Sequence, residues 1–134
     1  MTDDTAIREI TYDDAMRRFG AAMRASKLPT KPVNNCVYYA NDYACGALVY
    51  INPPAKTLAR IKATVTLPEW RGFGYGEQIL LHLIDEATRN GCTRIEVFTE
   101  QPDWYLRHGF TEVRTAPWGT KVLASSLTKT PPVN

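Results

Sequence analysis

The sequence predicts an α/β (α+β) fold in which a mixed, mostly antiparallel central sheet is flanked by helices on both faces. Segments with strand character outnumber helical ones, and their order is β-α-β-β-β-loop-α-β-α-β-β. Short turns join the strands of the first half, as in antiparallel hairpins. A strand–loop–helix–strand unit follows, as in a parallel crossover. The 134 residues suit one domain with a single core.

The first half of the chain combines a short strand, a helix and three longer strands. Thr11 is a favoured helix N-cap, and Asp13 and Asp14 suit the positive end of a helix dipole. Residues 27–35 are rich in Pro and Asn and predict a loop. The expected elements are a strand at 6–11, a helix at 12–26, and strands at 36–42, 44–52 and 57–67.

The strand at 57–67 alternates between apolar and polar residues. Strict alternation places Ile61, Ala63 and Val65 on one face, because successive side chains of a strand point to opposite sides. The other face then carries the polar residues Lys62, Thr64 and Thr66.

The second half begins with the most strongly amphipathic helix, at residues 76–90. Its apolar positions form one stripe, and Gly91 follows where a C-terminal cap belongs. The remaining expected elements are a strand at 93–99, a short helix within 102–110, and a closing hairpin at 110–114 and 120–125. We expect one domain over residues 1–134, with its core at about 6–123 and a flexible tail at 126–134.

Composition narrows the classes of partner. The net charge is only +2, and Lys and Arg are scattered among acidic residues, which argues against a nucleic-acid binder. The three cysteines cannot all pair and show no zinc-like spacing, so we expect reduced thiols, no metal and a cytoplasmic protein. The sequence contains no apolar run of about 18 residues and no signal-like leader, so we expect no membrane contact.

The stretch WRGFGYGE, at residues 70–77, places three glycines between the polar strand and the amphipathic helix. Unpaired N–H groups at a helix start attract anions, and glycines let the backbone curl around a phosphate. A Walker A loop would need Gly-Lys-Ser/Thr, and a Rossmann loop would need glycine where Glu77 stands. Both common nucleotide loops are therefore excluded by spacing.

The remaining pattern, R-x-x-G-x-G at Arg71, Gly74 and Gly76, resembles the GNAT superfamily of acyl-CoA-dependent N-acetyltransferases. The wider stretch LPEWRGFGYGEQIL is similar to the loop with which that family binds the pyrophosphate of coenzyme A. Downstream, WYLRHGF resembles the family's aromatic-Tyr-x-x-x-Gly-Phe segment. The two motifs stand in the family's order with a strand between them, and the expected elements match over roughly residues 6–123.

The resemblance implies an enzyme that transfers an acetyl group from acetyl-CoA, as co-substrate, to a primary amine by direct attack. It implies that the strand near Thr64 pairs with the pantetheine arm of the cofactor. It also implies that Tyr105 is the general acid that protonates the leaving thiolate. The implied cofactor-binding residues are Val65, Thr66, Leu67, Arg71, Gly72, Phe73, Gly74, Tyr75, Gly76 and Glu77.

The general base is less well defined. An alkyl amine must lose a proton before it attacks, at a cost of roughly 4.6 kcal/mol at pH 7. Many family members carry a Glu on the strand before the loop, but this chain offers no carboxylate there. Glu100 and Asp103, just beyond the next strand, are the nearest candidates.

The acceptor is either a small-molecule amine or a protein lysine or N-terminus. Residues Lys62, Thr64 and Trp118 are the candidates for contacting it, and residues 28–35 are the candidate acceptor-side loop. Lys62 could meet an acidic acceptor or, as we favour from the sequence, balance the exposed face of its strand. A homodimer is compatible with the resemblance.

Two alternatives stay open at this stage. The first is a catalytically weak, GNAT-like domain that binds acyl-CoA as a sensor or scaffold, which the missing strand carboxylate would explain. The second is a different nucleotide-binding domain, which preferential binding of NAD or ATP would reveal.

Overall fold

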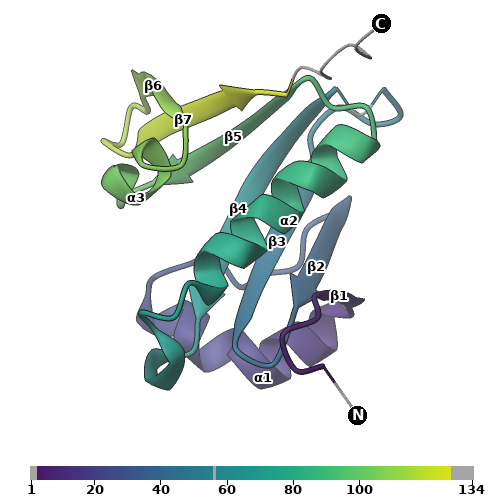
Figure 1. Ribbon diagram of the computed structural model, residues 1–134. Coiled ribbons are helices and arrows are strands. Elements are labelled where there is room, and N and C mark those ends of the chain that lie inside the picture. Colours follow the sequence, from purple (N-terminus) through teal and green to yellow (C-terminus); the bar gives the residue numbers. More distant parts are fainter. Residues whose placement is uncertain (1–2, 56, 128–134) are drawn as a thin grey trace, which may run out of the picture.

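The computed structural model describes residues 3–55 and 57–127 and contains a seven-stranded sheet flanked by helices (Figure 1). The strand order is β1-β2-β3-β4-β5-β7-β6, and β4 and β5 are the one parallel pair within these residues. The strands are β1 (Arg8–Ile10), β2 (Cys36–Ala40), β3 (Ala44–Tyr50), β4 (Leu58–Thr66), β5 (Arg94–Thr99), β6 (Thr111–Thr115) and β7 (Lys121–Ser126). The helices are α1 (Tyr12–Ala25), the short 3₁₀ turn η1 (Pro68–Trp70), α2 (Tyr75–Arg89) and α3 (Pro102–Leu106). The predicted fold class and element order are confirmed.

The helix ends follow the signals in the sequence. The hydroxyl of Thr11 accepts a hydrogen bond from the backbone N–H of Asp14 at 3.1 Å, which caps α1. Beyond α2, Gly91 adopts a φ of +89°, a left-handed conformation that favours glycine at the end of a helix. Both predicted helix boundaries therefore have the expected capping geometry.

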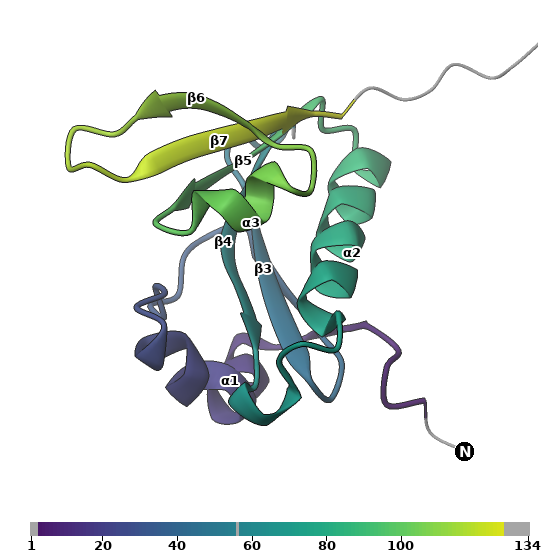
Figure 2. The same cartoon turned by 60° about the vertical axis from the view of Figure 1, so that its left-hand side comes forward.

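The two longer helices cover opposite faces of the sheet (Figure 2). On one face, the apolar stripe of α2 packs against the central strands, with Leu83 completely buried beside Leu48 and Ile95. On the other face, α1 packs Phe19 and Met23 against β2, β3 and the second half of β4. The sheet thus has one apolar cluster on each side, and α3 joins the cluster under α2 through Tyr105.

Strand β4 contains a β-bulge, and this corrects the predicted alternation of its faces. Ala47 on β3 pairs with Ala63 and the next residue, Leu48, pairs with Ile61, so Lys62 is an extra residue without a partner. Ile61 therefore faces α2, whereas Ala63 and Val65 face α1. The prediction that these three residues share one face was wrong, because a bulge reverses the alternation that follows it.

The same reversal divides the predicted polar face. Lys62 points to the side of α1, where it contacts Tyr38. Thr66 points to the side of α2, where its hydroxyl lies beside Gly76. The polar residues of β4 therefore serve two different regions of the molecule.

Strands β4 and β5 pair only over their first residues. Leu58–Ile61 pair with Arg94–Val97, and beyond this point the described residues provide no further pairs between the two strands. The two strands then diverge, as the views in Figures 1 and 2 both show. The divergence begins at the bulge and leaves the second half of β4 with one unpaired edge.

The end of the chain departs from the sequence expectation at two residues. Ser126 is the last residue of β7, and Leu127 is buried in the cluster under α2. The sequence had placed both in a loose tail because they follow the last clear alternation. The rest of that predicted tail, residues 128–134, lies outside the described residues.

A close contact between β3 and α2 yields a stability prediction. A Cβ atom on Gly46 would lie 2.5 Å from Cγ2 of Ile79 and 3.0 Å from Cδ1 of Leu83, both completely buried. We expect Gly46→Ala to lower the free energy of unfolding by about 1–3 kcal/mol, the usual cost of overpacking a core. Urea denaturation monitored by circular dichroism measures this change.

Gly20→Ala is the matched control. Gly20 lies within α1, and its added Cβ would meet only the flexible guanidinium of Arg24, at 3.3 Å. Because alanine is better than glycine in a helix by roughly 0.5–1 kcal/mol, this variant should lose no stability. Equal losses in the two variants would contradict the packing explanation.

Candidate active site

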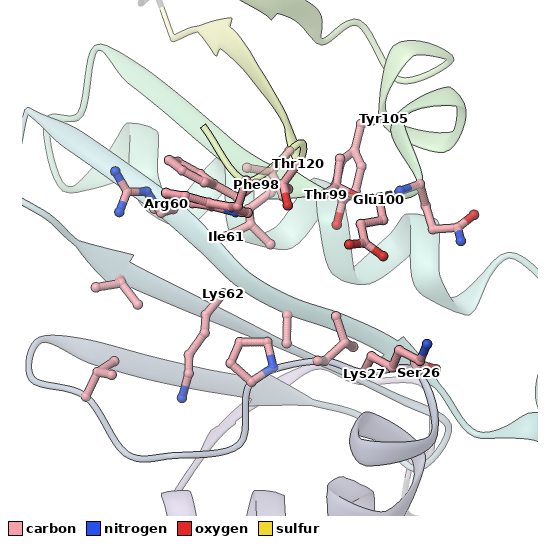
Figure 3. A pocket seen from close by; sticks show the side chains of 18 of the residues that line it. Ser26, Lys27, Arg60, Ile61, Lys62, Phe98, Thr99, Glu100, Tyr105 and Thr120 are labelled. Atoms are coloured by element: carbon pink, nitrogen blue, oxygen red, sulfur yellow. Dashed lines mark hydrogen bonds between the residues drawn. The ribbon is translucent and has the colours of Figure 1, made fainter. Parts of the chain in front are cut away.

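Two cavities open where β4 and β5 diverge, and they meet at Tyr105. The first, of about 900 Å³, lies beside the glycine-rich loop at the start of α2. The second, of about 860 Å³, lies on the other side of Tyr105, between Tyr105 and the loop that follows α1 (Figure 3). The residues that line both cavities are Ser26, Leu28, Thr99, Gln101 and Tyr105. We call the first the loop cavity and the second the distal cavity.

The loop cavity is built around the start of α2. Gly72 and Gly74 have φ angles of +89° and +84°, which other residues adopt only with strain. Gly74 is the N-cap, and no side chain caps the helix. The first N–H groups of α2 therefore remain available to an anion, and the helix dipole and the nearby guanidinium of Arg71 favour one.

Most residues predicted to bind a cofactor line this cavity. They are Val65, Thr66, Arg71, Gly72, Gly74, Tyr75, Gly76 and Glu77. Leu67 and Phe73 are not among its lining residues. Leu67 packs against the cluster under α1, and Phe73, which is 62% exposed, lies against Trp70 and Tyr75. The direction of a single side chain within the loop depends on the local backbone conformation, which a contiguous motif in the sequence cannot reveal.

The far wall of the loop cavity consists of residues that were not predicted from the sequence. Trp104, Arg107 and His108 line it from α3 and the turn that follows. The His108 ring packs edge-on against Trp104, with centroids 4.9 Å apart, and its Nδ1 lies 3.9 Å from a carboxylate oxygen of Glu77. Trp104 and His108 are four residues apart in WYLRHGF, a spacing that places two side chains on one face of a helix, and this signal could have located the wall.

Tyr105 is a buried core residue whose hydroxyl reaches the junction of the cavities. Its ring packs edge-on against Trp104 and Phe110, with centroid separations of 4.8 and 5.5 Å. Burial raises the pKa of the Tyr105 phenol, and the facing hydroxyl of Thr64 partly offsets that rise. The Thr64 hydroxyl oxygen is itself buried, and it has no hydrogen-bond partner among the described residues. Tyr105 is therefore held in one orientation with its proton retained.

The two candidate bases lie on different sides of Tyr105. Glu100 lines the distal cavity, and Figure 3 shows its carboxylate and the Tyr105 side chain pointing into that space. Asp103 lines the loop cavity instead. The separation arises at the end of β5, where the backbone N–H of Gln101 donates to the Thr99 hydroxyl at 2.8 Å and turns the chain.

The predicted acceptor residues are also divided. Lys62 and Trp118 line the distal cavity, whereas Thr64 lines the loop cavity. Part of the predicted acceptor-side loop does lie here, because Leu28, Pro29 and Val33 line the distal cavity. The Tyr12 hydroxyl donates to the backbone oxygen of Thr30 at 2.6 Å and holds this loop against α1.

An aromatic wall closes the end of the distal cavity near β7. The Phe98 ring stacks on Trp118, with centroids 6.2 Å apart, and the guanidinium of Arg60 lies 4.5 Å from the Phe98 centroid. Arg60 also donates through Nε to the buried carboxylate of Glu96, at 2.8 Å. The charge of Arg60 is thus compensated within the protein.

Other kinds of site find little support in the part of the chain that the structure describes. Residues 3–55 and 57–127 contain no group of three or more His, Cys, Asp or Glu side chains placed to hold a metal ion. The helices within these residues are too short or too polar to cross a membrane. Of the three free cysteines, Cys45 and Cys92 are buried and Cys36 is half-buried.

Comparison with known sequences gives a family match. Residues 33–112 match the family model of the acetyltransferase (GNAT) domain. An amino-acid acetyltransferase of Mycobacterium tuberculosis is 30% identical over 79 residues, which are 59% of this chain and 44% of that protein. The chain thus spans less than half of the length of this curated relative.

Solved structures share the fold. The N-acetylglutamate synthase of Neisseria gonorrhoeae, in complex with coenzyme A and L-arginine, superposes with a TM-score of 0.75 at 21% identity. The superposition covers 92% of this chain and 33% of that one. An aminoglycoside 6'-N-acetyltransferase in complex with coenzyme A gives a TM-score of 0.76 at 12% identity, and covers 95% of this chain and 99% of that one.

Proposed function

The chain belongs to the GNAT acetyltransferase family, and we propose that it transfers an acetyl group from acetyl-CoA to a primary amine by direct attack. The observation that carries the proposal is the meeting of the two cavities at Tyr105. One cavity suits a phosphate-bearing cofactor and the other leaves room for an acceptor. Acetyl-CoA and amine would then react between β4 and β5.

The loop cavity supports coenzyme A as the ligand. A pyrophosphate would accept hydrogen bonds from the uncapped N–H groups at the start of α2 and would lie near Arg71 and Arg107. The unpaired edge of β4 near Thr64 can pair with the amide groups of the pantetheine arm as an added strand would. A backbone N–H of that edge can also polarise the thioester carbonyl.

The junction of the cavities supports Tyr105 as the proton donor. Acetyl transfer breaks the bond between the carbonyl carbon and sulfur, and the departing thiolate takes up a proton. Because burial raises the pKa of Tyr105 above its ordinary value of about 10, the phenol stays protonated at neutral pH. The donor itself should therefore not limit the rate on the alkaline side until the pH exceeds 10.

The distal cavity favours Glu100 over Asp103 as the general base. An attacking amine approaches the carbonyl from the acceptor side, and Glu100 is the carboxylate that lines this side. Asp103 lies with the cofactor loop, across Tyr105. Glu100 can therefore take the ammonium proton, directly or through a water molecule.

The first prediction concerns the cofactor loop. Gly74→Trp should weaken binding of acetyl-CoA by at least about tenfold, because a large side chain at a φ of +84° would fill the site of the pyrophosphate. Isothermal titration calorimetry measures the affinity, with NAD and ATP as comparison ligands.

Gly91→Trp is the matched control for that experiment. Gly91 has a φ of +89° and open space around it, as Gly74 does, but it lies at the far end of α2. This variant should bind acetyl-CoA as the wild type does. Failure of the wild-type protein to bind acetyl-CoA, or a preference for NAD or ATP, would refute the proposed function.

The second prediction concerns the proton donor. Tyr105→Phe should lower kcat by roughly 10- to 100-fold and change the KM for acetyl-CoA little. The loss is partial because a thiol has a pKa near 8.5, so the thiolate can still leave without a proton donor, only more slowly. Release of free coenzyme A thiol reports the rate. Tyr39→Phe removes the hydroxyl of another buried tyrosine, outside both cavities, and should leave kcat unchanged. An unchanged kcat in Tyr105→Phe would show that Tyr105 is not the proton donor and that its side chain serves only in packing.

The third prediction separates the two carboxylates. At pH 7, Glu100→Gln should lose about 10- to 100-fold in kcat/KM for the amine, and the loss should shrink at higher pH as solvent deprotonates the amine. Asp103→Asn should lose less, because its carboxylate lies on the cofactor side. A larger loss in Asp103→Asn than in Glu100→Gln would reverse the assignment.

A further inference from the structure

We propose that the acceptor is a primary amine that also carries a carboxylate several bonds away, and that the ammonium group of Lys62 binds this carboxylate. The inference rests on the proposed function and names the chemical class of acceptor for the distal cavity. It departs from our favoured interpretation of the sequence, in which Lys62 only balances an exposed strand face.

The bulge of β4 determines where Lys62 points. As the unpaired extra residue of the strand, Lys62 lies on the same side of the sheet as its neighbour Ala63, toward α1. Its side chain lines the distal cavity and extends toward the loop after α1, as Figure 3 shows. There Nζ donates to the Tyr38 hydroxyl at 2.9 Å and to the backbone oxygen of Lys31.

Lys62 has no acidic partner in the part of the chain that the structure describes. Both acceptors of its hydrogen bonds are neutral, and they leave one of its three ammonium protons unused. Partial burial lowers the pKa of Lys62, because it takes the charge out of water, and the nearby Cys36 thiol offsets this effect only in part. A carboxylate in the cavity would supply a counter-charge and accept the remaining proton.

The charges around the distal cavity favour an acceptor that carries an anionic group over an acceptor that carries a second ammonium group. Lys27, Arg60 and Lys62 line it, and Glu100 is its one acidic lining residue within the described ranges. Glu96 already compensates Arg60. An acceptor with several ammonium groups would therefore meet like charges, whereas one carboxylate would be attracted.

The positions of the polar groups set the spacing within the acceptor. Glu100 and Tyr105 approach the cavity from one side, and Lys62 extends toward the opposite side (Figure 3). Because Lys62 reaches back over β3 to a tyrosine of β2, its charge lies at least about one strand spacing, ~5 Å, from the gap between β4 and β5. The single carbon between the groups of an α-amino acid is too short for this span.

Apolar side chains occupy the space between these polar ends. Leu28, Val33 and Val97 line the cavity together with Trp118, which is 71% exposed and belongs to the aromatic wall. A methylene spacer between the amine and the carboxylate would lie against these residues and lose contact with water. The cavity thus matches an ω-amino acid or another compound whose amine and carboxylate are separated by a similar spacer.

A matched pair of acceptors tests the proposal. 6-Aminohexanoic acid and 6-aminohexanamide differ in their charge at one end, whereas their amines, five carbons away, have nearly the same basicity. We expect kcat/KM to be at least about tenfold higher for the acid, and Lys62→Met to abolish this preference. Lys62→Arg should restore most of it. Release of coenzyme A thiol gives the rates.

Controls separate this proposal from the proposed function. Lys31→Met removes a neighbouring exposed lysine side chain but keeps the backbone oxygen that Lys62 contacts, so the preference for the acid should persist. Calorimetric titration with acetyl-CoA and thermal unfolding check that each variant is folded and binds the cofactor. Loss of cofactor binding in the wild type would overturn the proposed function itself.

Three outcomes would overturn the carboxylate proposal while leaving acetyl-CoA binding intact. The first is transfer to the amide at least as fast as to the acid. The second is a preference for the acid that survives in Lys62→Met. The third is binding of acetyl-CoA with no transfer to either compound, or with transfer only to an α-amino acid such as leucine.

Discussion

The incomplete pairing of β4 with β5 is the constraint on which the rest of the site depends. The strands pair from Leu58–Ile61 to Arg94–Val97, and the bulge at Lys62 then bends β4 away. A fully paired sheet would fill the place where Tyr105 now separates the two cavities. It would also satisfy the edge of β4 that lies open near Thr64. One extra residue in one strand thus creates the gap, exposes backbone polar groups and redirects the lysine beside it.

Close packing around this gap depends on the absence of side chains at two glycines. Gly46 allows α2 to lie directly on β3, where a Cβ would meet Ile79 at 2.5 Å. Gly76 allows the first turn of α2 to lie against the end of β4, where a Cβ would be 3.1 Å from the Thr66 hydroxyl. The start of the helix is therefore fixed beside the diverging strands. Glycine is therefore needed for close packing at Gly76 and for a positive φ angle at Gly72 and Gly74.

Local signals in the sequence were enough to predict the order of elements and the position of the loop cavity. Capping residues, alternation and the spacing of glycines act over a few residues, and the structure follows them. The bulge could not be predicted, because it depends on how β3 and β4 align and leaves no mark in the strict alternation of residues 61–66. The grouping of Lys62, Thr64 and Thr66 was wrong for this reason. The distal cavity was also beyond local reasoning, since its lining comes from the loop after α1, from β4, from the end of β5 and from the turn before β7.

The two cations that β4 directs toward the distal cavity differ in how their charges are compensated, and this difference indicates separate roles. Arg60 lies against the Phe98 ring and donates to Glu96, whose buried carboxylate also has Arg94 at 3.9 Å. The carboxylate of Glu96 thus compensates the guanidinium that packs against the aromatic wall. Two residues later on the same strand, Lys62 is partly buried and the described residues provide no carboxylate for it. A purely structural cation at that position would gain from a partner such as Glu96, and a partly buried cation without one is costly to the protein alone. The cost is offset when an anion enters the cavity, which is why we assign Arg60 to the wall and Lys62 to the ligand.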